Sequence, residues 1–565
     1  MGKKSKRAGT NTATLPEGAG KPHWSERLLA LLERRDRLLC LALVLAATAR
    51  IVATYAVFNH TIDEPAHVAC GMQWLSKAVY RYEPHHPPLA RVMAALGPYL
   101  AGAHSWGMKE MYAEGAGVLY AEFHYDRNLT LARLGVLPFF WIASAVVFLW
   151  SRRLFGSAVA VLATLLFTWL PSVLAHAGLA TTDMALTGLL GAALMATLAW
   201  LKNPSLLRTV AFGALAGLMA ISKLSALAYY PVCLLAMLIW KVFVERSVRP
   251  SLRLVKWQHV FTVVFAVILG ALVIWAGYRF SYGWNPLTRS RLPAPAFFAG
   301  IKSIMNMNKE GWPSYLLGQR SNSGWWYYFF VALFFKTPIG FMALALWGMV
   351  ISVERQKLGA YRIPAAIVGG ILFFTMFSRV NIGTRHVLPV YIGFSMTAAL
   401  CSWELLKKAP KARWAGWAVG VPLVWMLASS ALSHPDYLPY FNAFAGDEPE
   451  KILVDSDLDW GQDMDRLGKR LKELGAREVT FSPFIIAYFR EHHGFPPMRD
   501  MDPVQPSPGW NAVSLTGLKL TRLGLYEKYP EVTPWPELVR PTERVGQGTL
   551  LYYVPPAPVT QPPGR

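Results

Sequence analysis

The chain has 565 residues, of which 54% are hydrophobic and only 16% are charged. A long chain of this composition is typical of a protein that crosses a membrane several times. Its formal net charge is +22, but the basic residues form short clusters between apolar segments, where the positive-inside rule accounts for them, so nucleic acid is not an expected partner. The four cysteines, Cys40, Cys70, Cys233 and Cys401, are scattered and imply neither a disulfide framework nor a zinc ribbon.

About eleven apolar segments of spanning or near-spanning length follow one another along the chain. They cover roughly 38–58, 131–150, 158–176, 182–201, 207–222, 224–242, 259–279, 326–351, 362–377, 384–404 and 413–432. The KKSKR start is basic, and so is every second connection after it. The pattern predicts a multi-pass protein of the cell (inner) membrane with a cytoplasmic N-terminus and an exoplasmic, or periplasmic, C-terminal domain.

The domain organisation follows from this topology. We expect a basic N-terminus (1–37), a transmembrane domain (38–433) with exoplasmic loops at about 59–130 and 280–325, an exoplasmic α/β domain (434–555) and a disordered Pro-rich tail (556–565). In the first loop, the stripes of MQWLSKAVY and LARVMAALGPYLA predict amphipathic helices. In the C-terminal domain, MDRLGKRLKELG and IIAYFREHHG favour helices, and EVTFSPF, NAVSLT and GTLLYYV favour strands.

Charged residues gather on the predicted outer face. Asp63 and Glu64 follow the first span, and an HHPPL element stands at His85–Leu89. Asp183, in a Thr-Thr-Asp sequence, opens the fourth span, Lys223 stands between two spans, and Arg385 and His386 open the tenth. Ionisable groups at a membrane face are costly, so their gathering on one side indicates a functional site.

In order and sidedness these motifs resemble the GT-C membrane glycosyltransferases of family 39, which include protein O-mannosyltransferases and lipid A aminoarabinose transferases. The resemblance covers about 1–435, and the tail also resembles the exoplasmic tails of bacterial members. It implies an α-helical polytopic GT-C fold and an inverting transfer on the outer face, from a polyprenyl-phosphate-linked sugar to a protein, lipid or glycan acceptor. The family's catalytic aspartate matches Asp63, and its members carry an acidic residue at the place of Asp183.

Asp63 has two interpretations. Asp is a favoured helix N-cap, so Asp63 could cap the helix that follows. As a general base, it would take a proton from the acceptor while the acceptor attacks the anomeric carbon. We also count Glu64 among the catalytic candidates, with an orienting role beside Asp63. No general acid is required, because a phosphate ester leaves as a stable anion.

The leaving anion requires cations. Arg385 offers a bidentate fork and Lys223 a point charge, and His386 and His86 add two further candidate contacts to the donor phosphate. As the alternative, interfacial Lys and Arg side chains often extend to lipid headgroups. Asp183 either caps the fourth span or joins Asp63 at the reaction site.

A divalent metal is possible, but no cofactor is firmly predicted. His85 and His86 are weak candidate ligands, because adjacent histidines diverge and one pair does not complete a coordination sphere. Some aminoarabinose transferases have a Glu-Lys-Pro element here whose Glu can take part in a metal site, and this chain departs from it with His-His-Pro-Pro.

The acidic run DSDLDWGQDMD, from Asp455 to Asp465, begins like an EF-hand loop. Trp460 stands where the turn glycine belongs and Arg466 where the bidentate glutamate belongs, so a calcium site is not expected. Asp463 is interpreted as the N-terminal charge of a helix that begins near Met464, and acceptor recognition is a further hypothesis for the run. Two other functions stay open, a multi-span transporter and a noncatalytic membrane scaffold or sensor with an exoplasmic domain.

Overall fold

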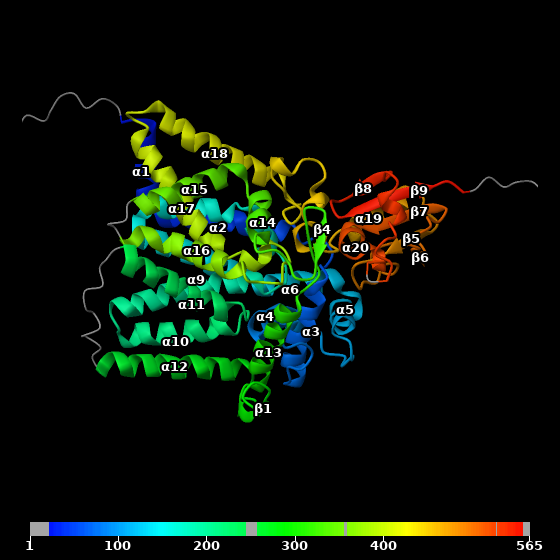
Figure 1. Ribbon diagram of the computed structural model, residues 1–565, viewed down its shortest axis with the longest axis horizontal. Helices are drawn as coiled ribbons and strands as arrows, with labels where there is room; N and C mark the ends of the chain where they lie inside the picture. The colour runs from blue at the N-terminus through cyan, green and yellow to red at the C-terminus, as the bar shows by residue number, and fades with distance from the viewer. Residues whose placement is uncertain (1–21, 245–256, 355–358, 527, 557–565) are drawn as a thin grey trace, which may run out of the picture.

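The structure is a computed structural model that describes residues 22–244, 257–354, 359–526 and 528–556. The basic KKSKR start, most of the basic connection before residue 257 and nearly all of the predicted tail lie outside the described residues. The chain is mostly helical, with a mixed β-sheet near its C-terminus (Figure 1).

Apolar helices form the main body of the molecule, in the left half of Figure 1. They are α2 (Asp36–Ala53), α6 (Tyr125–Phe155), α7 (Ser157–Thr168), α8 (Pro171–Ala177), α9 (Asp183–Lys202), α10 (Leu206–Ala220), α11 (Ala226–Ile239), α12 (Trp257–Gly277), α14 (Tyr328–Lys336), α15 (Ile339–Glu354), α16 (Ile363–Thr375), α17 (Val390–Lys408) and α18 (Arg413–Leu432), with α1 (Trp24–Arg34) before them. Among the described residues, four helices are long and apolar enough to cross a membrane, and α7 with α8 would make a fifth, bent span. Four more apolar helices are shorter. The protein therefore spans a membrane several times.

Two predicted spans are broken by proline. The span predicted at 158–176 forms α7 and α8, which meet at an angle of 68° where Pro171 begins the second helix. The span predicted at 326–351 forms α14 and α15, with Pro338 between them. Proline supplies no N–H and its ring clashes with the preceding turn, so it begins a helix more readily than it continues one.

The first loop folds into short helices at one end of the bundle. They are α3 (Asp63–Lys77), α4 (Pro88–Leu100) and α5 (Met111–Leu119), and α3 and α4 contain the two predicted amphipathic stripes. Gly71 lets α3 lie directly on α4, since a Cβ there would come within 1.9 Å of the carbonyl oxygen of Arg91. That close packing fixes the position of Arg91 against α3 within the first loop.

A second excursion at the same end follows α12. It contains the hairpin of β1 (Tyr282–Asn285) and β2 (Ser290–Pro293), helix α13 (Pro295–Glu310) and the hairpin of β3 (Ser314–Leu316) and β4 (Gln319–Ser321). Figure 1 shows α13 crossing the ends of the membrane helices, next to α3 and α4.

The C-terminal region is a five-stranded sheet in the order β6-β5-β7-β9-β8. Its elements are α19 (Met464–Glu473), β5 (Val479–Ser482), β6 (Met498–Asp500), β7 (Gly509–Ser514), α20 (Leu515–Thr521), β8 (Glu543–Val545) and β9 (Thr549–Val554). The strand β5 pairs in parallel with β6 and β7, whereas β9 runs antiparallel to β7 and β8. The helix predicted at MDRLGKRLKELG and the three predicted strands are confirmed as α19, β5, β7 and β9.

The helix predicted at IIAYFREHHG is wrong, because residues 485–494 form turns and irregular backbone. Tyr488, His492 and His493 pack on Tyr120 and Tyr125 of the first loop. Tertiary contacts of this kind override a local helical preference.

Short turns of 3₁₀ or π helix connect the larger elements. They are η1 (Ala121–Phe123), η2 (Trp240–Val244), η4 (Gly359–Arg362), η5 (Thr384–Val387), η6 (Ala443–Ala445), η7 (Pro449–Lys451), η8 (Asp455–Asp457), η9 (Arg522–Gly524) and η10 (Trp535–Glu537). Residues 455–463, which we call the acidic segment, join the membrane helices to the sheet. Asn59 Nδ2 donates to the carbonyl of Gly461 over 2.7 Å, and the Ile62 amide donates to that of Trp460 over 3.0 Å.

Candidate active site

A cavity of about 890 Å³ lies where the first loop, the membrane helices and the C-terminal region meet. Much of its wall is apolar and comes from α11, α13 and the residues at the end of α16, among them Leu227, Ala228, Ile301, Ile304, Phe374 and Phe377. The predicted site residues Asp63, His85, His86, Lys223, Arg385 and His386 also line it, although they come from four separate parts of the chain. Glu64 and Asp183 do not line it.

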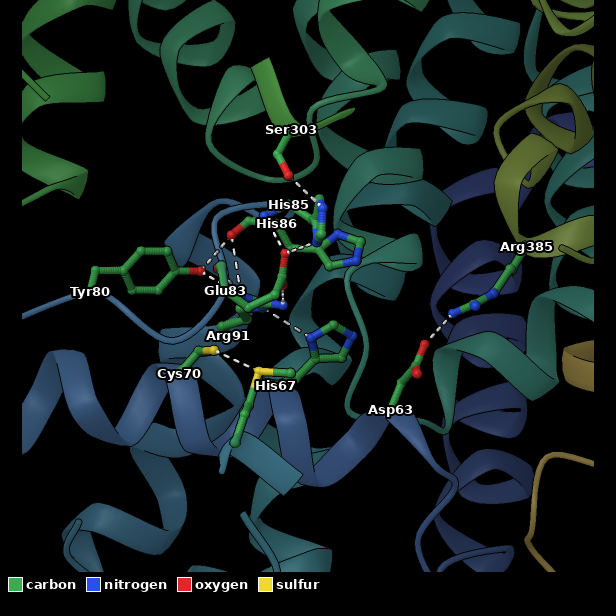
Figure 2. A network of polar contacts seen from close by, with 11 residues as sticks. Asp63, His67, Cys70, Tyr80, Glu83, His85, His86, Arg91, Ser303 and Arg385 are labelled. Atoms are coloured by element: carbon green, nitrogen blue, oxygen red, sulfur yellow. Dashed lines mark hydrogen bonds and ion pairs between the residues drawn. The ribbon is translucent and has the colours of Figure 1, made fainter. Parts of the chain in front are cut away.

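Asp63 begins α3 and faces Arg385. Its Oδ2 accepts a hydrogen bond from Arg385 Nη1 over 2.7 Å (Figure 2). No side chain makes a capping hydrogen bond at the N-terminus of α3. Asp63 therefore does not act as a helix cap. The Asp63 side chain remains 23% exposed, which leaves part of the carboxylate open to the cavity.

Arg385 stands in η5 between α16 and α17. Its guanidinium lies over the ring of Trp460 at 4.3 Å, and its Nε is buried without a hydrogen bond to any described residue. The preceding residue, Thr384, is held by Asp457, which accepts bonds from its hydroxyl over 2.7 Å and from its amide. Arg385 is thus a buried, oriented cation whose Nε–H has no acceptor among the described residues, and it does not extend to lipid headgroups.

Lys223 and Asp183 form a second ion pair. Lys223 Nζ lies 2.5 Å from Asp183 Oδ1, and both side chains are buried. The other carboxylate oxygen, Asp183 Oδ2, has no hydrogen-bond partner among the described residues. No side chain caps α9, so Asp183 acts on Lys223 and not as a helix cap. Through this pair, Asp183 orients the cation at the cavity wall.

Glu64 points away from the cavity into a saturated network. Its two oxygens accept bonds from Arg133 Nε and Nη2, both at 2.9 Å, and from the amides of Ala180 and Thr61. Glu64 and Arg133 are both buried. This geometry gives Glu64 an anchoring position between the first loop and α6, and a direct catalytic part for it stays an untested prediction.

The histidines belong to a polar network at one side of the cavity (Figure 2). His85 Nε2 lies 2.6 Å from Ser303 Oγ, and its Nδ1 lies 2.5 Å from Glu83. His86 Nδ1 is buried and unpartnered among the described residues. Burial lowers the pKa of His86 well below its ordinary value, and the neighbouring cation Arg91 lowers it further. His86 is therefore a neutral imidazole at pH 7 that can donate or accept a hydrogen bond.

Arg91 organises the same network from α4. Its Nε donates to His67 Nδ1 over 3.0 Å, and its Nη2 pairs with Glu83. Sequence reasoning missed both Arg91 and Glu83, although an arginine two residues after HHPPL was available as a signal.

No group of three or more His, Cys, Asp or Glu side chains suited to hold a metal occurs in the described part of the chain.

The acidic segment contributes Asp455 and Trp460 to the cavity wall. Its other carboxylates are structural: Asp459 accepts bonds from Ser514 and Thr516, and Asp463 accepts the amides of Gln547 and Gly548. Helix α19 begins at Met464 as expected, with Asp463 at its N-cap position but no side-chain cap. The sequence showed the density of aspartates here, but it could not show that Asp455 faces the cavity.

Comparisons with known proteins give structural matches alone. No protein-family model matches the sequence, and no curated protein matches it. The chain is similar to the crystal structure of ArnT from Cupriavidus metallidurans bound to undecaprenyl phosphate, with 15% identity, a TM-score of 0.47, and coverage of 90% of this chain and 97% of that one. It is also similar to AglB, the oligosaccharyltransferase of Archaeoglobus fulgidus, in complex with an inhibitory peptide and a dolichol phosphate, with 12% identity, a TM-score of 0.45, and coverage of 86% and 70%. Membership of family 39 stays a prediction.

Proposed function

We propose that this chain is an inverting membrane glycosyltransferase of the GT-C type, in family 39, that moves a sugar from a polyprenyl-phosphate-linked donor to an acceptor on the outer face of the membrane. The observation that carries the proposal is the gathering of Asp63, Lys223 and Arg385 on one largely apolar cavity. A polyprenyl-phosphate sugar has the matching parts, namely an apolar chain, an anionic phosphate and an electrophilic anomeric carbon.

In this mechanism Lys223 and Arg385 bind the donor phosphate. The unpartnered Nε of Arg385 provides a donor for a phosphate oxygen, and Lys223 adds a second positive charge held in place by Asp183. Buried cations of this kind stabilise the charge that develops on a leaving phosphate, because water does not screen them. The neutral imidazole of His86 and the neighbouring His386 supply further contacts on the same wall.

Asp63 acts as the general base. The acceptor oxygen or nitrogen forms a bond to the anomeric carbon, the bond from that carbon to the phosphate oxygen breaks, and its electron pair stays with polyprenyl phosphate. The acceptor's proton passes to the Asp63 carboxylate. Asp63 is bound to Arg385 through Nη1, so a donor phosphate can bind the unpartnered Nε while the same guanidinium keeps the carboxylate oriented toward the acceptor.

The proposal also assigns the sides of the membrane. The first loop, α13 and the C-terminal sheet lie at the same end of the membrane helices (Figure 1), and we assign that end to the outer face and the N-terminus to the cytoplasm. Cysteine-accessibility labelling tests the assignment, with residues near 155 and 410 expected inside and residues near 300 and 500 outside. Labelling of residue 500 from the cytoplasm would contradict it.

The decisive experiment follows the leaving group. Purified full-length protein in lipid nanodiscs is incubated with total membranes as the source of acceptor and with a panel of polyprenyl-phosphate sugars, and the release of polyprenyl phosphate is measured. We expect release from at least one donor, and release at least about 100-fold slower from a protein that carries Asp63→Asn. Equal release by both proteins, or no release from any donor in the presence of total membranes as the source of acceptor, would contradict the proposed function.

A further inference from the structure

Asp455 differs from the other charged side chains on the cavity wall. The cations of the wall are already matched with carboxylates: Arg385 with Asp63, Lys223 with Asp183, and Arg91 with Glu83. Within the part of the chain that the structure describes, Asp455 has no ion pair, although it lines the same cavity. It is therefore the one carboxylate of this wall whose charge is left for a ligand.

Three hydrogen bonds hold Asp455 in an uncommon backbone conformation. Its φ angle is +59°, in the left-handed region that few residues other than glycine adopt. The Asp455 amide donates to Thr516 Oγ1 over 2.9 Å, the Leu458 amide donates to its carbonyl over 2.9 Å, and the Ser456 amide donates to its Oδ1 over 2.6 Å. Backbone held in such a conformation is common at binding sites. No described residue donates to its second oxygen, Oδ2.

The position of Asp455 indicates which substrate it meets. It belongs to the C-terminal region, together with Phe484, Leu520 and Thr521 of the same wall. The apolar part of the wall, by contrast, comes from membrane helices such as α11 and from α13. A lipid-linked donor reaches the cavity from the membrane side, so the C-terminal side is left for the acceptor.

We propose that Asp455 is an acceptor-recognition residue, and that it selects acceptors whose reacting end is a hydroxyl or an amine over acceptors that end in a phosphate. The inference rests on the proposed function and adds the acceptor class to it. A hydroxyl or an ammonium group can donate a charge-assisted hydrogen bond to the free carboxylate oxygen. A phosphate acceptor would instead face Asp455 and Asp63, while Lys223 and Arg385 are engaged by the donor phosphate, and like charges this close repel.

The charged surroundings of Asp455 set its pKa, and the pKa predicts the pH range in which Asp455 can recognise an acceptor. Burial raises the pKa of Asp455 to about 6, the Arg385 charge opposes the shift, and the Asp63 and Asp457 carboxylates add to it. Tyr328 of α14 also faces the group. Asp455 is mostly ionised at pH 7 and mostly protonated below pH 5, so the affinity for an acceptor should fall as the pH falls through about 6.

The first experiment determines which kind of bond joins the transferred sugar to its acceptor, and it does not require the acceptor to be known. Full-length protein is incubated with the donor that it uses, labelled in the sugar, and with total membranes of the source cell. A sugar on a hydroxyl resists mild acid, whereas a sugar on a phosphate is released by it. A sugar on an amine is also released by mild acid, and mass spectrometry of the intact product distinguishes it from a sugar phosphate. We expect an acid-stable product or a glycosylamine. A product in which the sugar is joined to a phosphate would overturn the inference and leave the proposed function standing. Release of polyprenyl phosphate with no transfer to any membrane component would instead contradict the proposed function itself.

The second experiment uses Asp455→Asn. Asparagine adopts the left-handed region more readily than most residues, so the backbone should be kept. Half-maximal transfer should need about 10- to 100-fold more membrane acceptor than in the wild type, because a hydrogen bond to a charged group is lost. The apparent KM for the donor should change far less. The control is Asp500→Asn, which removes the same charge from an exposed position on β6.

Acceptor-dependent transfer that is unchanged in Asp455→Asn would contradict the acceptor role. Should that variant fold poorly, the wild-type protein gives a separate readout between pH 5 and pH 7.5. The acceptor concentration for half-maximal transfer should rise below about pH 6. Hydrolysis of the donor by water, measured as release of polyprenyl phosphate in the absence of acceptor, should not follow the same curve. Identical pH curves for the two reactions would also overturn the inference.

Discussion

Two adjacent carboxylates, Asp63 and Glu64, lie in regions of opposite character. Glu64 belongs to a buried anchor in which both oxygens accept hydrogen bonds from Arg133 and from backbone amides. Asp63 belongs to the cavity, where Arg385 and His86 each carry a buried polar atom without a partner among the described residues. Buried polar groups are normally satisfied within the protein. The comparison indicates that the anchor is complete in itself, while the cavity wall is built to receive a polar ligand.

The largest effect is expected on the anchor side, from Glu64→Gln. The substitution removes the charge that neutralises the buried guanidinium of Arg133, and a broken buried pair costs about 3–5 kcal/mol of folding free energy. Thermal unfolding in nanodiscs should show a clear decrease in the midpoint. The fraction that remains folded should release polyprenyl phosphate at a rate close to that of the wild type, since Glu64 does not line the cavity. A stable Glu64→Gln protein without activity would reverse the assignment of the two carboxylates.

The cavity side is tested by Asp63→Asn. Asparagine has nearly the same size and accepts a hydrogen bond from Arg385, but it cannot take the acceptor's proton. Turnover should fall by about 100-fold or more, within the range that general bases contribute. Donor binding and the unfolding midpoint should change little. A well-folded Asp63→Asn protein that binds the donor and transfers sugar at the wild-type rate would remove Asp63 from the mechanism.

The difference between Asp63 and Glu64 also shows which features of the fold and the site can be predicted from the sequence alone. Hydropathy and the sidedness of charged residues predict a multi-span helical protein and place Asp63, Lys223 and Arg385 on one face, because membrane insertion depends on local composition. The partners of Asp63 and Glu64 are 322 and 69 residues away, and no local pattern encodes contacts of that separation. The breaks at Pro171 and Pro338, the cavity position of Asp455 and the irregular backbone at 485–494 likewise depend on tertiary packing.

A smaller effect is expected from Arg385→Lys. Lysine keeps the positive charge but lacks the planar fork that can bond Asp63 through Nη1 and a phosphate through Nε. The loss of one charge-assisted hydrogen bond should weaken donor binding about tenfold or more. The apparent KM for the donor measures the effect, with Lys407→Arg on α17 as a control because Lys407 lies away from the cavity and contacts Trp403. An unchanged KM would contradict the phosphate clamp.

The smallest effect is expected from Asp457→Asn, which alters the support of Arg385 and not the cavity wall. The Asp457 carboxylate holds Thr384 through its hydroxyl at 2.7 Å and its amide at 3.1 Å, and the neutral amide of asparagine keeps one acceptor but loses the charge that strengthens both bonds. A weakening of about 1 kcal/mol, or about fivefold in donor KM, is expected from such a loss. Asp457 should act through the position of Arg385, so Asp457→Asn should add little to the KM of an Arg385→Lys protein. Fully additive effects of the two substitutions would show that Asp457 supports the fold generally and has no specific part in positioning the cation.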